Sequence, residues 1–324
     1  MNSDGLTFSA SPPAQPAGRS APRIPPGVEY HRVLAGEKRR IGRGVLAIAL
    51  LVAGLFASQL VLAVGAAFID AQMGNTNPTF GGTDYTPLFL SANLVSIALL
   101  IPWSILIQRW LYGVRGPSLH SVVSQFRFDL FGRAILYVGP FWLFLSLIGP
   151  AVMPLRDVDW STATLLTVFA AGLLLTPLQA AGEEYGFRGL VFRVAGSWAR
   201  GPRTALALGA VVSGLMFTGV HLSTDPWFML WTFTLSVSLA VITWRTGGIE
   251  VAVVVHALHN TLAALVATVL HADPTPALDR SAGTGSAALL VLCAGVVAVT
   301  AVVWWRTRGS GPALTPAEPH SGRV

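Results

Sequence analysis

Charged residues are scarce in this sequence. They fill 11% of its 324 positions, whereas an ordinary soluble domain carries about 25%. So few charges could not cover the water-facing surface of a chain this long. Hydrophobic residues make up 53%, and the mean hydropathy is +0.61. The shortage of charge therefore excludes a soluble enzyme and a disordered regulator, and it indicates an integral membrane protein that crosses the bilayer several times.

Cysteine and lysine are nearly absent. Cys293 is the only cysteine, so the chain can form no internal disulfide and can build no metal site from thiolates. Lys38 is the only lysine, and arginine supplies the rest of a formal net charge of +6. Because these charges lie between apolar runs, they fit the positive-inside rule better than contact with nucleic acid. We expect membrane lipids and no nucleic acid as partners, and the richness in arginine, alanine and glycine favours a bacterial cell membrane.

Eight apolar runs are present, and a helix needs about 20 such residues to cross about 30 Å of hydrocarbon. They cover residues 44–69, 88–107, 134–153, 163–181, 205–220, 227–244, 251–270 and 286–305. The sequence therefore predicts an all-α, polytopic membrane helix bundle of about eight transmembrane helices within residues 31–308. Residues 1–30 and 309–324 are rich in Pro, Ser and Gly, and we predict that they are disordered cytoplasmic tails.

Positive charge is distributed unevenly between the two ends of this predicted bundle. Within residues 31–308, sixteen arginines and lysines fall on the side of the termini, whereas Arg156 and Arg280 alone fall on the other side. Because basic residues accumulate on the cytoplasmic side, both termini are predicted to be cytoplasmic. An even number of spans is consistent with that orientation.

The first polar cluster, Ala-Gly-Glu183-Glu184-Tyr-Gly-Phe-Arg188-Gly-Leu, directly follows the fourth apolar run. If one helix continues through it, Glu184 and Arg188 share a face, and their pairing lowers the cost of placing both in the membrane. Glu183 then points about 100° away and can face a cavity. The alternative is a helix that ends at Ala181 and leaves both acids solvated in a loop.

Two further polar clusters follow. Phe217 and His221 lie one helical turn apart, and His256 and Asn260 lie four residues apart with His259 close to the same face. A structural histidine and a polar contact between helices are the alternatives to function. Together the clusters provide a carboxylate, imidazoles, an amide and a guanidinium, which are the groups that peptide hydrolysis by water needs. Glu183, His221 and His256 could instead hold zinc.

These motifs, Glu183-Glu184-x-x-x-Arg188, Phe217-x-x-x-His221 and His256-x-x-x-Asn260, resemble those of the CPBP intramembrane peptidases, the CAAX protease and bacteriocin-processing or ABI family. The resemblance covers a peptidase core of about residues 165–270. It implies an intramembrane endopeptidase in which Glu183 activates water and His221 positions or polarises that water. It further implies that His256 and Asn260 form the oxyanion site, while Glu184 and Arg188 support them. The family resemblance leaves a glutamate and a metal mechanism both open.

A non-catalytic membrane scaffold or chaperone remains an alternative, and so does a transporter, because either could place charges in the membrane. We see no inverted repeat of the kind that transporters often carry. The substrate is expected to be a membrane-associated peptide or protein. Whether it is lipidated, and the oligomeric state of the chain, are left open by the sequence.

The heights of the three motifs impose a condition on the fold. With simple helix ends, Glu183 lies near the cytoplasmic surface, His256 lies about 10 Å deeper, and His221 lies near the outer end of its helix. They can meet only if the fourth helix continues past Arg188 and the fifth helix is shifted or tilted. We expect a cavity that opens toward the cytoplasm.

Overall fold

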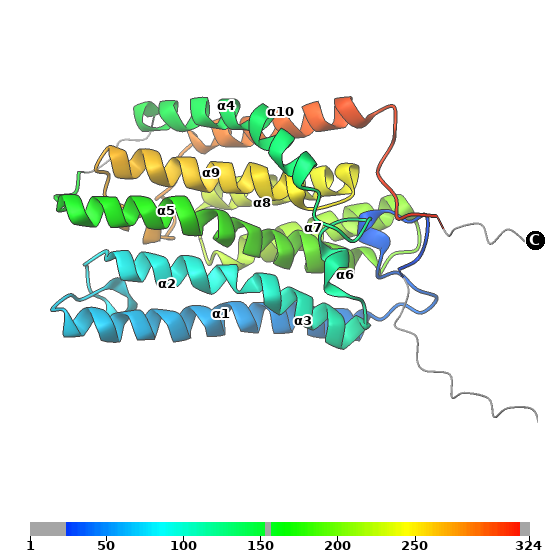
Figure 1. Ribbon diagram of the computed structural model, residues 1–324, viewed down its shortest axis with the longest axis horizontal. Helices are drawn as coiled ribbons and strands as arrows, with labels where there is room; N and C mark the ends of the chain where they lie inside the picture. The colour runs from blue at the N-terminus through cyan, green and yellow to red at the C-terminus, as the bar shows by residue number, and fades with distance from the viewer. Residues whose placement is uncertain (1–23, 153–156, 318–324) are drawn as a thin grey trace, which may run out of the picture.

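The computed structural model describes residues 24–152 and 157–317, and eight spans run through this part of the chain (Figure 1). The predicted all-α bundle is therefore confirmed. The spans are α1 (Ile41–Gln72), α2 with α3 (Pro87–Ala98 and Leu100–Tyr112), α4 (Phe128–Val152), a fourth span that begins with α5 (Thr162–Glu183), α7 (Pro202–Val220), α8 (Pro226–Thr246), α9 (Glu250–Val269) and α10 (Leu289–Thr307).

Several helices begin at a residue whose side chain caps the helix and that is followed directly by proline. Thr86 accepts a hydrogen bond from the amide of Phe89 at 3.0 Å, and Asp225 accepts one from the amide of Phe228 at 2.8 Å. The next residue in both cases is a proline, whose fixed φ suits the first helical position and whose missing N–H is not needed there. Helix starts are therefore encoded locally.

The fourth span is longer than predicted. After Glu183 it continues as a π-helix over Glu184–Val191 and then as α6 (Phe192–Gly196), so that one helical span of 35 residues covers Thr162–Gly196. The alternative of a helix ending at Ala181 with solvated acids is therefore wrong. The polar residues that lowered the local hydropathy lie inside the span because they satisfy one another there.

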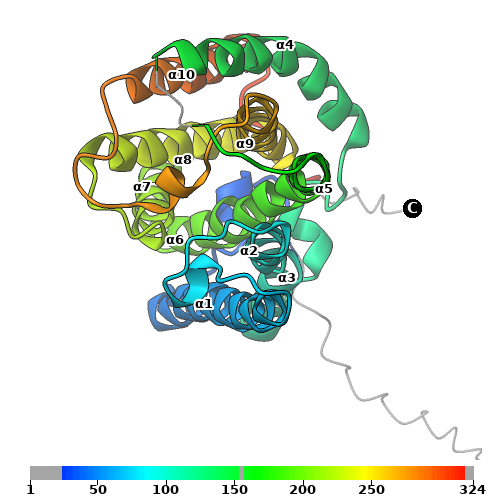
Figure 2. The ribbon, with the colours of Figure 1, turned by 90° about the vertical axis from the view of Figure 1, so that its left-hand side faces the viewer.

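The spans form three layers when viewed along the bundle (Figure 2). One outer layer contains α1, α2 and α3, and the other contains α4 and α10. Between them lie α5, α7, α8 and α9, with α5 in contact with α2 on one side and α9 on the other. The central layer carries all three polar motifs.

Parts of both predicted tails are folded together. Glu29 and Leu314 form a β-bridge, with hydrogen bonds from the Gly27 amide to the Thr315 carbonyl at 3.1 Å and from the Thr315 amide to the Val28 carbonyl at 2.9 Å. The prediction of disorder is therefore wrong for residues 24–30 and 309–317, because backbone pairing and buried side chains hold them. The remainder of both tails lies outside the described residues. This pairing places the two described ends of the chain at the same end of the bundle.

A topology test follows from the paired ends and the charge bias. Gly81 is exposed and has open space around its α-carbon, and it lies in the connection between the first and second spans. We expect a reporter inserted after Gly81 to be outside the cytoplasm and one fused after Arg308 to be inside. Activity of both reporters in the same compartment would contradict the arrangement.

A second prediction concerns the contact between α5 and α2. A β-carbon at Gly182 would collide with the carbonyl oxygen of Ile97, whereas one at Gly186 would meet its nearest atom, on Leu51, at 3.4 Å. Gly182→Ala should therefore lower the free energy of unfolding by about 1–3 kcal/mol through overpacking. Thermal unfolding in detergent would measure this, with Gly186→Ala as the matched control. Equal stability of the two variants would argue against a tight helix contact at Gly182.

Candidate active site

The predicted ion pair lies at the start of the π-helix. The Arg188 guanidinium donates from Nε to Glu184 Oε2 at 2.6 Å and makes a second contact through Nη2 to Glu184 Oε1. Both side chains are fully buried. Nη1 also lies 3.4 Å from Ser236 Oγ on α8, and the guanidinium lies over the Phe217 ring at 4.6 Å. Contacts from three helices thus replace the water that an arginine would otherwise require.

His256 joins the two neighbouring glutamates. Its Nδ1 lies 2.7 Å from Glu184 Oε1, and its Nε2 lies 3.3 Å from Glu183 Oε2. When the imidazole is protonated, the four groups Arg188, Glu184, His256 and Glu183 alternate in sign and carry no net charge. A neutral chain of charges is the arrangement that burial favours. The spacing in sequence indicated the Glu184–Arg188 pair but gave no indication that one histidine contacts both carboxylates.

His221 is the C-cap residue that directly follows α7. Its Nδ1 lies 2.6 Å from the carbonyl oxygen of Phe217, and because a carbonyl can only accept, Nδ1 must be the donor. In the neutral ring Nε2 then carries the lone pair, which can accept a hydrogen bond from water. The Phe217 ring meets both His221 and His256 edge to face, with centroids 4.7 Å and 5.8 Å away. Phe217 therefore packs at the centre of the three motifs.

Asn260 contacts a residue that the sequence motifs do not include. Its amide nitrogen donates to Gln179 Oε1 at 3.1 Å. Gln179 lies four residues before Glu183 on α5, and this spacing on a shared helix face is the signal that could have revealed it. His259 turns away from the site, and its ring packs between Trp142 and Trp231. His259 is therefore not a member of the polar cluster.

The more accessible edge of the cluster is formed by His221 and Asn260. Both are partly exposed, whereas Glu183 and His256 are buried. Toward the end of the bundle that carries the termini, residues 250–257 of α9 and the whole π-helix are buried. In this conformation the site is therefore closed on the side from which we expected entry, because both segments are buried there.

Two contacts that sequence reasoning missed close that side. Arg127, in the connection before α4, binds the buried Glu250 through Nε at 2.8 Å and Nη2 at 2.7 Å. The hydroxyl of Tyr185 lies 2.5 Å from Nδ1 of His120. Burial lowers the pKa of His120, an effect that outweighs the attraction of Glu250, so Nδ1 of the neutral ring can accept a hydrogen bond from the Tyr185 hydroxyl. Both contacts join residues far apart in sequence, and no short motif indicates them.

The donor set does not fit the zinc alternative. Among the described residues, no group of three or more His, Cys, Asp or Glu side chains is arranged to hold an ion. We therefore derive no chemical step through a metal.

Comparison with known families agrees with the motifs. Residues 160–262 match the family model described as Type II CAAX prenyl endopeptidase Rce1-like. The match includes all three polar motifs and confirms the predicted family resemblance over this segment. No curated protein matches the chain.

The buried ion pair yields a stability prediction. Arg188→Ala would leave Glu184 charged and buried without its partner, and a broken buried pair costs about 3–5 kcal/mol. We expect lower abundance in membranes and a lower unfolding temperature in detergent.

The matched control is Arg133→Ala, because Arg133 makes the same four-residue pair with Asp129 in an exposed position. An exposed pair of this kind contributes about 0.3–0.5 kcal/mol, so the control should unfold almost as the wild type does. If Arg188→Ala were as harmless, the pair would have to be solvated.

Proposed function

We propose that the chain is an intramembrane endopeptidase that hydrolyses a peptide bond in a membrane-associated peptide or protein with water activated by Glu183. The observation that carries the proposal is the buried chain of contacts from Arg188 through Glu184 and His256 to Glu183. A purely structural ion pair would be complete with Glu184 and Arg188. The second carboxylate and the imidazole add groups that can exchange a proton.

Glu183 is the proposed general base. Its carboxylate borders the partly exposed edge of the cluster, and a carboxylate that accepts the proton of water generates the nucleophile. The lone pair on His221 Nε2 would accept a hydrogen bond from the same water and orient it. The two groups lie on different helices, α5 and α7, so the water is held from two directions.

His256 and Asn260 are the proposed donors to the oxyanion that forms when water attacks the peptide carbonyl. In the imidazolium form of His256, Nδ1–H donates to the ion-paired Glu184, so Nε2–H is the donor that remains. Once Glu183 has accepted a proton, it holds Nε2–H less strongly, and this donor becomes available for the oxyanion as negative charge develops there. The amide of Asn260 donates one hydrogen to Gln179 and keeps a second for the same purpose.

Glu184 and Arg188 are positioning residues in this proposal, because they contact His256 and Phe217 and have no part in bond making. Their pair fixes the orientation of the imidazole, and Phe217 packs between Arg188 and both histidines.

The multi-pass membrane location and the charge bias further support cytoplasmic termini.

Glu183→Gln is the sharpest test of this proposal. The amide keeps the shape of the side chain but cannot accept a proton from water, and general-base catalysis contributes about 10²–10⁴-fold. We expect cleavage to fall by about that factor while the protein remains folded. Comparison of peptide termini in membranes from wild-type and variant cells would measure the loss for any membrane substrate.

Asp129→Asn provides a matched control, because Asp129 is 71% exposed and pairs with Arg133 near the start of α4, outside the polar cluster. It should leave cleavage unchanged. A non-catalytic scaffold predicts full biological activity in Glu183→Gln, and a transporter predicts altered solute flux without a change in peptide termini. Either result would overturn the peptidase proposal.

A further inference from the structure

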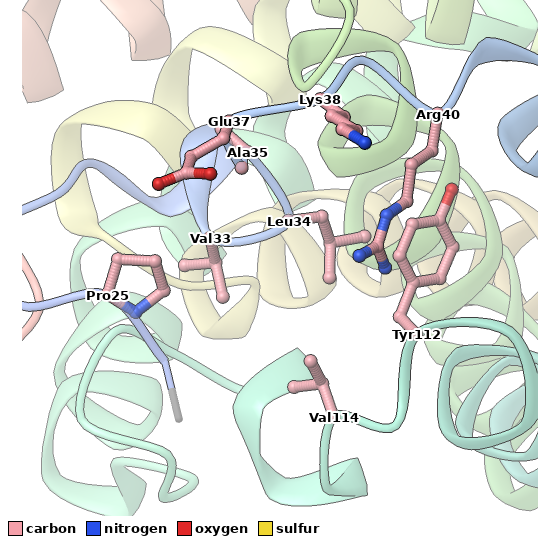
Figure 3. A pocket seen from close by; sticks show the side chains of 10 residues that line it. Pro25, Val33, Leu34, Ala35, Glu37, Lys38, Arg40, Tyr112 and Val114 are labelled. Atoms are coloured by element: carbon pink, nitrogen blue, oxygen red, sulfur yellow. The ribbon is translucent and has the colours of Figure 1, made fainter. Parts of the chain in front are cut away.

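A hollow of about 360 Å³ lies at the end of the bundle that carries both termini, between the segment before α1 and the loop after α3 (Figure 3). Its apolar walls include Val33, Leu34 and Val114. Lys38, Arg40 and Tyr112 also line it, and in Figure 3 the Tyr112 ring lies on the same side as the Arg40 side chain. No residue of the three polar motifs lines it, so this hollow is separate from the candidate active site.

The hollow carries an excess of positive charge. Lys38 and Arg40 line it, and Arg39 and Arg43 are their near neighbours in sequence. None of these four forms an ion pair within the described part of the chain. Glu37 is the one acidic residue of the lining. The protein therefore leaves positive charge here that an anion could neutralise.

Tyr112 gives an independent indication of a polar ligand. Its side chain is 7% exposed, and its hydroxyl has no hydrogen-bond partner among the described residues. Buried hydroxyls are rarely left unsatisfied. A ligand with acceptor oxygens in the hollow would provide the partner.

The start of α1 adds free donors beside these side chains. Arg40 occupies the N-cap position and makes no capping hydrogen bond through its side chain, and the first helical bond runs from the Gly44 amide to the Arg40 carbonyl. The preceding amides therefore have no acceptor within the helix. Amides at a helix start favour phosphate groups, so together with the Arg40 guanidinium they suit a phosphate ligand.

The surrounding residues place this hollow at the depth of lipid headgroups. Ile41, Val45 and Leu46 are about half exposed immediately after Arg40, and Trp110 is 61% exposed near the end of α3. Exposed aliphatic residues of a span face lipid chains, and tryptophan collects at the interface. A phosphate bound beside Arg40 thus lies directly above a surface suited to acyl chains, which a soluble phosphate would leave unused.

We propose that this hollow is a binding site for the phosphodiester headgroup of an anionic glycerophospholipid, with Lys38, Arg40 and Tyr112 as its ligands and the exposed face of α1 as the seat of its acyl chains. The site does not depend on the proposed peptidase activity.

The test is a titration of the purified full-length protein in detergent with short-chain phosphatidylglycerol. A ligand that binds only the folded protein raises the unfolding temperature in proportion to the logarithm of its concentration over Kd, so the titration yields an apparent Kd. We expect stabilisation by phosphatidylglycerol and none by phosphatidylcholine or inorganic phosphate at equal concentration. Stabilisation by inorganic phosphate alone would overturn the lipid assignment.

Variants separate a defined site from diffuse attraction. Lys38→Gln with Arg40→Gln should weaken the apparent Kd by about 30-fold, as two interfacial cations contribute. Tyr112→Phe, which changes no charge, should weaken it by about tenfold through loss of one hydrogen bond to a charged group. Unfolding temperatures without lipid establish that each variant remains folded.

The matched control is Arg306→Gln with Arg308→Gln, which removes two cations from the end of α10 at the same end of the bundle, where both stack on Trp305. It should change the apparent Kd by less than threefold, an approximate bound for screened surface charges. A loss as large as that of the Lys38 and Arg40 variant would show general attraction to the membrane end. An unchanged Kd in Tyr112→Phe would likewise remove the assigned site.

Discussion

Arg188 and Glu184 neutralise each other inside a membrane span, and the helices around them supply what water would otherwise supply. Hydrocarbon cannot solvate a guanidinium, so every contact of Arg188 must come from protein. Ser236 of α8 and Phe217 of α7 provide two of them, and His256 of α9 shares the carboxylate. The need to satisfy one charge pair therefore brings four helices to one point, and the candidate catalytic groups lie at that point.

The π-helix explains how this convergence fits within a single span. Segments of this kind are uncommon and occur frequently at functional sites, because the extra residue per turn changes the direction of the side chains that follow. Glu183 is the last residue of α5 and Glu184 is the first of the π-helix. Their side chains leave the helix in different directions, yet both reach His256 because its two nitrogens lie on different edges of the ring.

The sequence predicted the parts of this structure that depend on local spacing or on composition. Eight spans follow from hydropathy, and the Glu184–Arg188 pair follows from a four-residue interval. The end of the fourth span could not be predicted in this way, because polar residues that neutralise one another lower the hydropathy of a segment that is nevertheless buried. The Asn260–Gln179 and Arg127–Glu250 contacts were missed for a different reason. They join separate elements, and the geometry that brings them together arises only when the helices pack.

The pairing of Val28 with Thr315 has a mechanical consequence for the bundle. The segment before α1 runs past α6 and α8, where Trp244 donates to Glu29 at 3.2 Å, and meets the segment that follows α10. This pairing therefore links the two outer layers to each other at one end of the bundle. Any parting of the layers must then be widest at the opposite end, on the side where His221 and Asn260 are already partly exposed.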